Sequence, residues 1–388
     1  LFRMGKRDDE MAMKKLVRKR LFKTKLGIKE TTWRDKKKER AKEKEERKVA
    51  ILEGEKESKE RINKGINEDK GKPYCLSIAI PGSFLLNAQS SELRTYMAGQ
   101  IARAATLFQV SEIVVYDETG RMTQSQLDSY WSGSWYGDIV PSPSNVEANF
   151  HLSRILEYLE CPQYLRKALF LRQRPLQYAG LLNPLDSQHH LKSNDLSLRY
   201  REGVVLDKPV KKGRGPLVDI GLDKELELEQ ESSLPPGTRI TVEMGSIETD
   251  SGKRYRGKVT SARKANEKTG MYWGYNVRIA KRIGEVIDHK KYDMIIGTSP
   301  KGTRACELEV NTMDKARILV VFGGIDGLDA AIEADEAAEY NNSQEAFSLL
   351  IKPLVANGSR SERIEENVLV TLSTLDSRLA DLYGYEIL

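Results

Sequence analysis

The chain has few of the residues from which metal centres and disulfide frameworks are built. Three cysteines and four histidines are scattered over its 388 residues, and no C-x-x-C motif occurs. This sparsity indicates a reducing compartment and argues against structural zinc. The one adjacent pair, His189-His190, is expected to form a hydrogen-bonded turn, because neighbouring side chains project differently and rarely ligate one ion. We therefore expect no metal.

Long hydrophobic runs and familiar catalytic signatures are also missing. No segment approaches the roughly 18–20 apolar residues that a membrane span needs. The first residues are basic and lysine-rich without an apolar core, which is not the pattern of a secretory signal. We expect no membrane association. No P-loop lysine, H-E-x-x-H or Ser-His-Asp order occurs, so motif spacing alone names no reaction.

Charge of one sign gathers in the first part of the chain. Residues 1–72 hold 26 of the 63 lysines and arginines but only 15 of the 57 acidic residues, a balance of +11. The rest of the chain is therefore mildly acidic, at −5, within a net charge of +6. Residues 1–72 are expected to form a charged arm that is largely disordered or helical. Such an arm suits nuclear import and attraction to RNA phosphates, which predicts a location in the nucleus or nucleolus.

Residues 73–200 have the pattern of an α/β domain. Apolar spacing predicts a strand, a helix and a second strand, at Leu76–Ile80, Ser91–Phe108 and Glu112–Tyr116. This order predicts a parallel sheet with helices packed on it. Residues 119–146 are polar and contain Gly, Ser and Pro, so a loop is expected there, followed by a helix over Asn149–Leu159.

Residues 201–277 change character and predict a small β-barrel inserted in the α/β domain. Six short strands separated by turn signals are expected, at Gly203–Leu206, Leu217–Ile220, Leu226–Leu228, Arg239–Val242, Tyr255–Thr260 and Tyr275–Ile279. Cations and aromatics interleave near its end, which suits stacking and phosphate contacts with RNA. The candidate RNA-binding residues are Arg254, Arg256, Lys258, Arg263, Lys264 and Trp273. An ordinary solvated barrel with aromatics in its core is an equal alternative.

The α/β pattern resumes over residues 278–388, where two glycine loops are the strongest candidates for a ligand site. A buried strand, Ile318–Phe322, runs into Gly323-Gly324, and Asn357-Gly358-Ser359-Arg360 is expected to cap and open a helix. Glycine has no Cβ, so backbone amides can approach a ligand closely. Gly323-Gly324 fails the G-x-G-x-x-G fingerprint, no helix is expected directly after it, and a tight turn explains it equally well. Arg360, a cation at a helix start, is expected to face a phosphate or carboxylate.

Polar residues also follow two other predicted strands. Asn87, Gln89 and Arg94 lie beyond the carboxyl end of the first strand, at the edge where open α/β sheets place their sites. Amides with an arginine one turn along suit a base edge and a phosphate, although a plain loop and helix cap is the default explanation. Met294–Ile296 likewise runs into Gly297-Thr298-Ser299.

Ordered sequence blocks recur from about residue 74 to residue 384. They include Asn87-Ala-Gln-Ser-Ser-Glu-Leu-Arg-Thr-Tyr96, Leu159-Glu-Cys-Pro-Gln-Tyr-Leu-Arg-Lys-Ala168, Ala179-Gly-Leu-Leu-Asn-Pro-Leu-Asp186, Gly270-Met-Tyr-Trp-Gly-Tyr275, Val321-Phe-Gly-Gly324 and Gly358-Ser-Arg360. Together these blocks resemble the SPOUT-class RNA methyltransferases of eukaryotes and archaea. The resemblance implies an α/β SPOUT fold with a C-terminal trefoil knot, interrupted by an inserted OB-like β-barrel.

The resemblance also implies ligands and partners. S-adenosylmethionine is expected as cofactor, with S-adenosylhomocysteine as product, and RNA as substrate. The wider superfamily suggests ribosomal RNA and uridine N3. A homodimer is implied, with each site completed near the subunit interface, and ribosome-assembly or mitotic-apparatus proteins are further candidate partners. The alternative is a catalytically silent RNA-binding scaffold that kept the fold, whereas the failed fingerprint disfavours a nucleotide-binding oxidoreductase.

Site residues follow from the resemblance position by position. Cofactor contacts are implied at Gly297, Thr298, Phe322, Gly323, Gly324, Asn357, Gly358, Ser359, Arg363, Ile364 and Glu365. Arg360 is assigned to charge stabilisation, and Asn87, Gln89 and Arg94 to orienting the target nucleotide. No residue is an obvious general base. The run from residue 361 to residue 367 departs from the family pattern, which affects the side-chain part of the cofactor contact more than the backbone part.

Overall fold

The computed structural model describes most of the chain beyond its basic arm. The described residues are 13–14, 72–135, 144–170, 173–192, 195–210, 213–229, 234–245, 253–308, 315–354, 356, 358–359 and 362–384. The chain divides into two compact units, Leu1–Gly65 and Ile66–Leu388, and the second contains all the elements below. The predicted arm lies almost wholly outside the described residues.

A six-stranded parallel sheet forms the centre of the second unit. Its strands are β1 (Tyr74–Pro81), β2 (Glu112–Tyr116), β8 (Asn276–Ala280), β9 (Met294–Arg304), β10 (Ala316–Val321) and β11 (Leu349–Lys352). They lie in the order β11-β9-β10-β1-β2-β8, and every neighbouring pair is parallel. Parallel strands covered on both faces read as continuous apolar runs, as β1 and β10 do. The predicted strand–helix–strand unit is confirmed.

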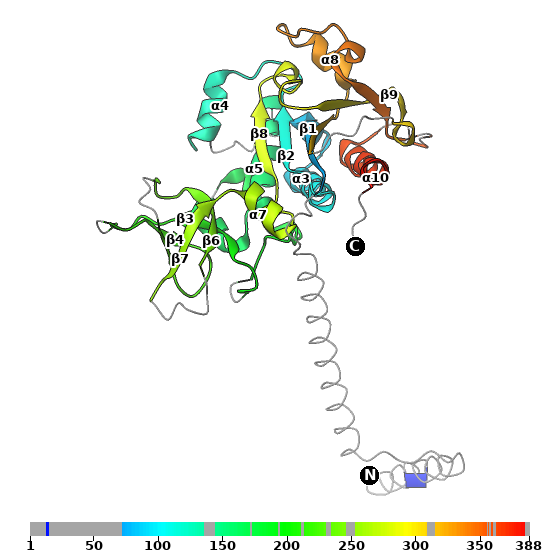
Figure 1. The fold of residues 1–388 in the computed structure, drawn as a ribbon. Coiled ribbons are helices and arrows are strands. Elements are labelled where there is room, and N and C mark those ends of the chain that lie inside the picture. Colours follow the sequence, from blue (N-terminus) through cyan, green and yellow to red (C-terminus); the bar gives the residue numbers. More distant parts are fainter. Residues whose placement is uncertain are drawn as a thin grey trace, which may run out of the picture. The chain divides into compact units, whose positions relative to one another are not determined.

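Helices cover both faces of this sheet. On one face α3 (Ser91–Leu107), α5 (Asn145–Glu160) and α10 (Ile364–Tyr383) share a core with alternate residues of β1 such as Ile78 and Ile80. Ala79 points to the opposite core, which includes residues of α8 (Gly327–Glu333). Figure 1 shows α10 beside α3. Among the residues that the structure describes, no helix has the length and apolar character needed to cross a membrane.

The inserted segment forms a closed five-stranded barrel, as predicted. Its strands are β3 (Tyr200–Val205), β4 (Leu217–Asp219), β5 (Leu226–Leu228), β6 (Arg239–Met244) and β7 (Tyr255–Thr260), in the order β3-β4-β5-β7-β6. Figure 1 shows them as a group distinct from the sheet. The sixth predicted strand, Tyr275–Ile279, is not part of the barrel, because β8 pairs with β2. A short strand pattern predicts extended backbone but does not specify its partner.

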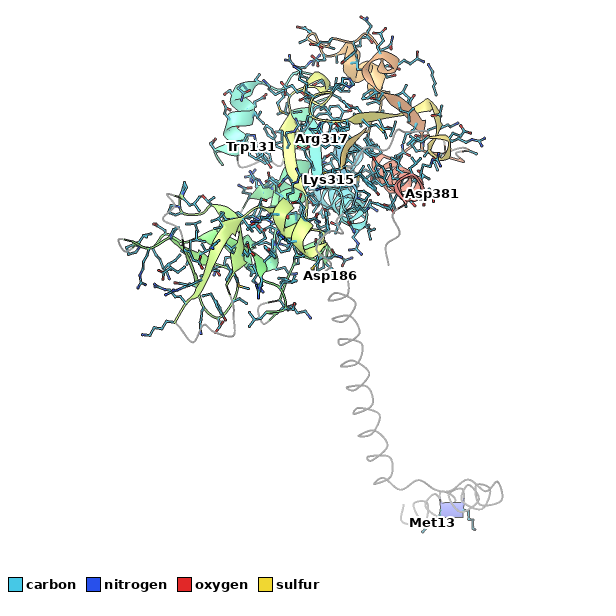
Figure 2. All side chains as sticks on the ribbon, in the orientation of Figure 1. Met13, Trp131, Asp186, Lys315, Arg317 and Asp381 are labelled. Atoms are coloured by element: carbon cyan, nitrogen blue, oxygen red, sulfur yellow. The ribbon has the colours of Figure 1, made fainter. Side chains whose placement is uncertain are left out.

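The predicted loop over residues 119–146 is wrong in part, because it contains a helix. α4 (Gln124–Trp131) begins at a capping box formed by Thr123 and Gln126, and Figure 2 labels the exposed Trp131 at its end. A second capping box, Ser144 with Glu147, starts α5 at Asn145 instead of the predicted Asn149. Both boxes are visible in the sequence as a hydroxyl residue followed three positions later by Gln or Glu.

Short helices complete the fold. They are η1 (Gly82–Asn87), α6 (Gln163–Leu169), η2 (Arg174–Leu176), η3 (Ala179–Leu181), α7 (Ala262–Thr269), η5 (Ile283–Glu285), η6 (Ala305–Glu307) and α9 (Ser343–Ala346). Of these, η1 directly follows β1 and packs against α5. It therefore sets the backbone path at the carboxyl end of the sheet.

A buried ionic network joins the barrel to the α/β domain. Arg239 of β6 donates two hydrogen bonds to Glu160 at the end of α5, of 2.6 and 3.0 Å, and a third of 2.8 Å to Glu202 of β3. The Trp273 indole donates to Glu202 at 2.7 Å, and the His189 ring lies 3.1 Å from Glu160. Burial alone would raise the pKa of Glu160, but Arg239 and His189 lower that pKa to about 2. The network thus holds the buried Glu160 carboxylate in its charged form.

Replacing Arg239 with Met is expected to destabilise the protein strongly, because Glu160 and Glu202 would stay buried without their common cation. Removing one partner of a buried ion pair costs about 3–5 kcal/mol. Urea unfolding monitored by tryptophan fluorescence would measure the loss. Arg214→Met, which removes an exposed cation near Glu227, serves as control and should cost no more than about 1 kcal/mol. Equal effects of the two variants would contradict the role of the network.

Candidate functional site

Two of the predicted cofactor segments lie side by side at one edge of the sheet. Gly297 and Thr298 belong to β9 and Phe322–Gly324 follow the neighbouring strand β10, while the third segment follows β11 along the chain. Gly297 of β9 lies beside Val321 of β10, and the Thr298 hydroxyl donates to the Val321 carbonyl at 3.3 Å. This is the edge at which open α/β sheets bind ligands.

Gly297 lies inside β9 and not in the predicted loop. Leu350 of β11 pairs with Gly297, and the next residue, Ile351, pairs with Thr303. Residues 298–302 therefore bulge out of the ladder, with Thr298 first. A Cβ at Gly297 would lie 2.7 Å from the Leu350 side chain and 2.9 Å from that of Phe347. Packing against two side chains accounts for this glycine, while Thr298 starts the exposed bulge.

Gly323 and Gly324 form a tight turn that folds back on a helix. The Gly327 amide donates to the Gly324 carbonyl at 3.2 Å, and Gly327 has a φ of 85°, which favours glycine. A Cβ at Gly323 would lie 2.9 Å from the backbone of Gly327 and of Leu328. The expectation that no helix follows this turn is wrong, because α8 begins at Gly327. Seven residues are too few for a clear helical period in the sequence.

The entry to this turn is held by a buried tyrosine. The Tyr116 hydroxyl, at the end of β2, donates to the Phe322 carbonyl at 2.7 Å. The Phe322 amide donates to Ala79 of β1 at 2.9 Å. Burial raises the pKa of Tyr116, so the hydroxyl keeps its proton and remains a donor. β1, β2 and β10 are thus tied together directly before the glycine turn.

Glu118 is a residue of this edge that the sequence analysis missed. It follows β2 by two positions, and its carboxylate occupies the space that a Cβ at Gly324 would fill. Burial raises the pKa of Glu118, and the nearby carboxylates of Asp326 and Asp117 act in the same direction, against the Ser83 hydroxyl. The signal was present in the sequence: an acidic pair, Asp117-Glu118, directly follows a predicted strand at its carboxyl end.

The second glycine loop is only partly described. Asn357 and Arg360 lie outside the described residues, whereas Gly358 and Ser359 are exposed. The predicted cap is wrong: α10 begins at Ile364, after Arg363, and no side chain caps it. Asn, Gly and Ser favour turns as well as caps, so the pattern did not specify the first helical residue.

The side chains at the start of α10 differ in their exposure. Ile364 and Glu365 are buried, and Glu365 lies in the first turn, where the helix dipole favours a carboxylate. The Arg363 guanidinium is largely exposed and lies 3.9 Å from Glu366. Arg363 therefore faces solvent, whereas the two following residues, Ile364 and Glu365, do not.

The polar segment before α3 lies close to the same edge. Asn87 and Gln89 are exposed, and Ser90 caps α3 by accepting from the Leu93 amide. Arg94 is half-buried and lies near His151 of α5, whose pKa is lowered to about 4 by burial and by the Arg94 charge. His151 is a further residue that the sequence analysis did not select. The neutral imidazole of α5 and the guanidinium of α3 thus lie where these two helices pack together.

The candidate RNA-binding cations form a row on the barrel that acidic residues accompany. Arg254, Arg256 and Lys258 occupy alternate, outward-facing positions along or beside β7. Glutamates in and directly after β5 accompany them. Arg254 lies 3.7 Å from Glu227, Lys258 lies 3.4 Å from Glu229, and Arg256 pairs with Glu227 in the strand register. The row therefore presents mixed charge. Its cations are long, exposed side chains that can exchange a carboxylate for a phosphate.

Two further candidate cations lie on α7, and one candidate is misplaced. Arg263 and Lys264 are exposed in the first turn of α7. Trp273, by contrast, is 5% exposed and its indole donates to Glu202, so it does not offer a face to a base. Tyr272 and Tyr275 are buried in the same way, with hydroxyls bonded to the Val110 and Leu156 carbonyls. The aromatic cluster belongs to the core, which was the alternative explanation.

Within the described part of the chain, no group of three or more His, Cys, Asp or Glu side chains is arranged to hold a metal ion. Cys161 is buried, and burial raises the pKa of its thiol to about 12, so it stays protonated.

The fold and the site define a class of protein: an α/β enzyme with a ligand edge built from three neighbouring strands and an inserted barrel. A family model described as "Putative RNA methyltransferase" matches residues 75–375. The chain therefore belongs to this RNA methyltransferase family, and the resemblance to the SPOUT class is confirmed. Its substrate is RNA, and its reaction requires a methyl donor.

Relatives along nearly the full chain agree with this assignment. A Caenorhabditis elegans protein named "Putative methyltransferase spot-1" is 50% identical over 368 residues, covering 94% of this chain and 96% of the relative. A Homo sapiens protein named "28S rRNA (uridine-N(3))-methyltransferase" is 43% identical, covering 80% of each chain. A Drosophila melanogaster protein of the same name is 40% identical, covering 87% of this chain and 70% of the relative.

Gly323→Ala is expected to destabilise the protein, because the new methyl group would collide with backbone atoms that cannot rotate away. Overpacking of this kind costs about 1–3 kcal/mol. Gly358→Ala is the matched control: a Cβ there meets nothing within 4 Å, so stability should change by no more than about 0.5 kcal/mol. Urea unfolding of both variants measures the difference. A neutral Gly323→Ala would show that the turn is not packed against α8 in solution.

Proposed function

We propose that this chain transfers a methyl group from S-adenosylmethionine to N3 of a uridine in large-subunit ribosomal RNA. The observation that carries the proposal is the match with relatives named 28S rRNA (uridine-N3)-methyltransferase over four-fifths of the chain. The position of Thr298 beside the end of β10, where the Phe322–Gly324 turn begins, supports it. A catalytically silent scaffold would have no use for such an edge.

The residues at this edge suit S-adenosylmethionine. Thr298, Gly323-Gly324 and Gly358-Ser359 offer backbone groups beside small side chains, as an adenine edge requires. A Cβ at Gly358 would point into open space, so a ligand can approach this turn closely. The cofactor supplies a methyl group on a sulfonium cation, and S-adenosylhomocysteine is its product. We also propose that β9, β10, β11 and their connections form the trefoil knot of the SPOUT class.

Target orientation is assigned to the polar segment before α3. Asn87 and Gln89 are exposed beside this edge and have amide groups that can pair with a base. Arg94 is assigned to the same orienting role, and Arg360 to phosphate or charge stabilisation. Most of the rate enhancement would come from holding the attacking nitrogen in line, because orientation alone can supply several orders of magnitude.

A homodimer is the proposed assembly. Leu93 and Tyr96 lie one turn apart on α3 and are 49% and 56% exposed. Exposed apolar side chains at this spacing suit a helix-to-helix contact between two copies. Because α3 follows the Asn87–Ser90 segment directly, such a contact would place the partner near each site. We further propose a nuclear or nucleolar location and contacts with ribosome-assembly or mitotic-apparatus proteins.

The first experiment is calorimetry with S-adenosylmethionine and S-adenosylhomocysteine. Wild type is expected to bind about one molecule per chain. Gly358→Trp should abolish binding because the indole would fill the open space beside the turn, whereas Gly180→Trp, at an equally open glycine of η3, should bind normally. Nucleoside mass spectrometry of treated ribosomal RNA should then show 3-methyluridine. A folded wild type that binds neither ligand would favour the scaffold alternative.

The barrel row is expected to bind RNA phosphates. The double variant Arg256→Gln/Lys258→Gln should weaken RNA binding similarly for all sequences. The slope of the logarithm of the binding constant against the logarithm of the salt concentration should become shallower by roughly one for each phosphate that the protein no longer neutralises. Fluorescence anisotropy at several salt concentrations measures both effects. Lys290→Gln, which removes an exposed cation of the α/β domain, is the control. An unchanged salt slope would remove the β7 row from the RNA-binding surface.

A further inference from the structure

Methylation of uridine at N3 has a chemical requirement that the assigned residues do not meet. N3 of a neutral uridine carries a proton, and its lone pair becomes a good nucleophile only when that proton is removed. Arginine and the amides of Asn and Gln are not proton acceptors at neutral pH. If the proposed function holds, another group at the site must accept the proton.

Glu118 is placed for this task by three segments of the structure. It follows β2, its carboxylate lies against Gly324 of the cofactor turn, and it adjoins Ser83, which follows β1. These three segments come from neighbouring strands in the order β10-β1-β2. The carboxylate therefore lies between the proposed cofactor turn and the loop that leads to Asn87.

A buried hydroxyl adjoins the Glu118 carboxylate. Ser83 is 4% exposed, and its hydroxyl lowers the pKa of Glu118, against the larger effect of burial. The hydroxyl therefore favours the ionised carboxylate, which is the form that can accept a proton.

The charged groups near Glu118 raise its pKa, which is the direction that suits a general base. Asp117 and Asp326 are acidic, Tyr116 stays protonated, and Ser83 is neutral. No arginine, lysine or histidine within the described ranges forms an ion pair with Glu118. Burial and the two acidic neighbours raise the pKa of Glu118, which moves it towards the working pH.

Asp117, the acidic residue next to Glu118, has a different role. Its carboxylate accepts hydrogen bonds from the backbone amides of Thr119, Arg121 and Met122 and is therefore fully used in holding the turn. This turn fixes the direction in which Glu118 leaves β2. Asp117 is thus a positioning residue, and Glu118 is the carboxylate that remains available.

We infer that Glu118 is the general base that removes the N3 proton of the target uridine. Glu118 takes the proton, the electron pair freed on N3 forms the new bond to the methyl carbon, and the pair of the broken carbon–sulfur bond stays on sulfur. The proton then passes from Glu118 to water after the product leaves. The competing role for the same carboxylate is that of a counter-ion to the cationic cofactor.

Three variants separate these roles: Glu118→Gln, Glu118→Asp and, as control, Glu333→Gln on the exposed surface of α8. Single-turnover methylation of an RNA oligonucleotide containing the target uridine is measured with cofactor saturating. Glu118→Gln should lower the rate by roughly 10²–10⁴-fold, the usual contribution of a general base. Glu118→Asp should retain part of the rate, and Glu333→Gln should match wild type.

Binding measurements make the interpretation specific. Calorimetry with S-adenosylmethionine and anisotropy with RNA should give the same dissociation constants for Glu118→Gln and wild type. A rate restored by raising the cofactor concentration, together with weaker cofactor binding, would assign Glu118 to the cofactor and overturn the base role. A Glu118→Gln enzyme as fast as wild type would overturn it as well.

A more acidic target provides a chemical rescue. The fluorine of 5-fluorouridine makes N3–H more acidic, so the target ionises without help. The variant should recover at least tenfold relative to wild type on this RNA. The rising limb of its pH–rate profile should follow ionisation of the target N3, and should therefore shift to lower pH with 5-fluorouridine, whereas the wild-type limb should follow ionisation of Glu118. Equal defects on both RNAs would overturn the proposal.

Stability supplies a readout that needs no ligand. The pKa of Glu118 is higher in the folded chain than in the unfolded chain. Below its pKa in the unfolded chain the carboxyl is protonated in both states and does not change the free energy of unfolding. As the pH rises through its pKa in the folded chain, the ionised form lowers the free energy of unfolding. Glu118→Gln should therefore melt at a higher temperature than wild type at pH 8, with the difference vanishing near pH 4. A variant less stable than wild type at pH 8 would show that the carboxylate is structural.

Failure of the proposed function can be told apart from failure of the base role. If wild type itself makes no 3-methyluridine, the proposed function fails, and the reactions of wild type alone reveal this.

Discussion

The whole site depends on the double pairing of β1, which bonds to β10 on one side and to β2 on the other. Ala79 pairs with Val321, and Pro81 pairs with Tyr116, so these strands end at one level. Because all three are parallel, their following turns emerge together. Ser83, Glu118 and Gly324, far apart along the chain, meet for this reason alone. A one-residue slip in either pairing would send each side chain to the opposite face of the sheet.

The barrel depends on a different interaction, the cation of Arg239 shared between Glu160 and Glu202. Buried ion pairs often add little net stability compared with apolar packing, but they are demanding in geometry. Here the pair joins the end of α5 to two barrel strands, and the buried Trp273 indole completes it. The network therefore fixes the position of the barrel with respect to the end of α5.

The proposed catalytic edge contains carboxylates whose closeness lowers local stability. Three carboxylates, those of Asp117, Glu118 and Asp326, gather where strands end, and only Asp117 is fully satisfied by backbone amides. Functional sites commonly retain such unfavourable groups because chemistry needs them. The glycines beside them serve packing as well as ligand approach: Gly323 is required by the backbone of α8, whereas Gly358 is open.

Local features of this protein were determined by its sequence. Continuous apolar runs and helical spacing were enough for β1, α3, β2 and the barrel strands, and the ordered blocks were enough for the family. Tertiary structure alone decided which strand partners Tyr275–Ile279, that Trp273 is buried, and that Glu118 reaches Gly324. The physical reason is the range of the forces involved. Periodicity records which face of an element is apolar, whereas strand order and side-chain contact depend on residues far away in the chain, whose positions no local pattern encodes.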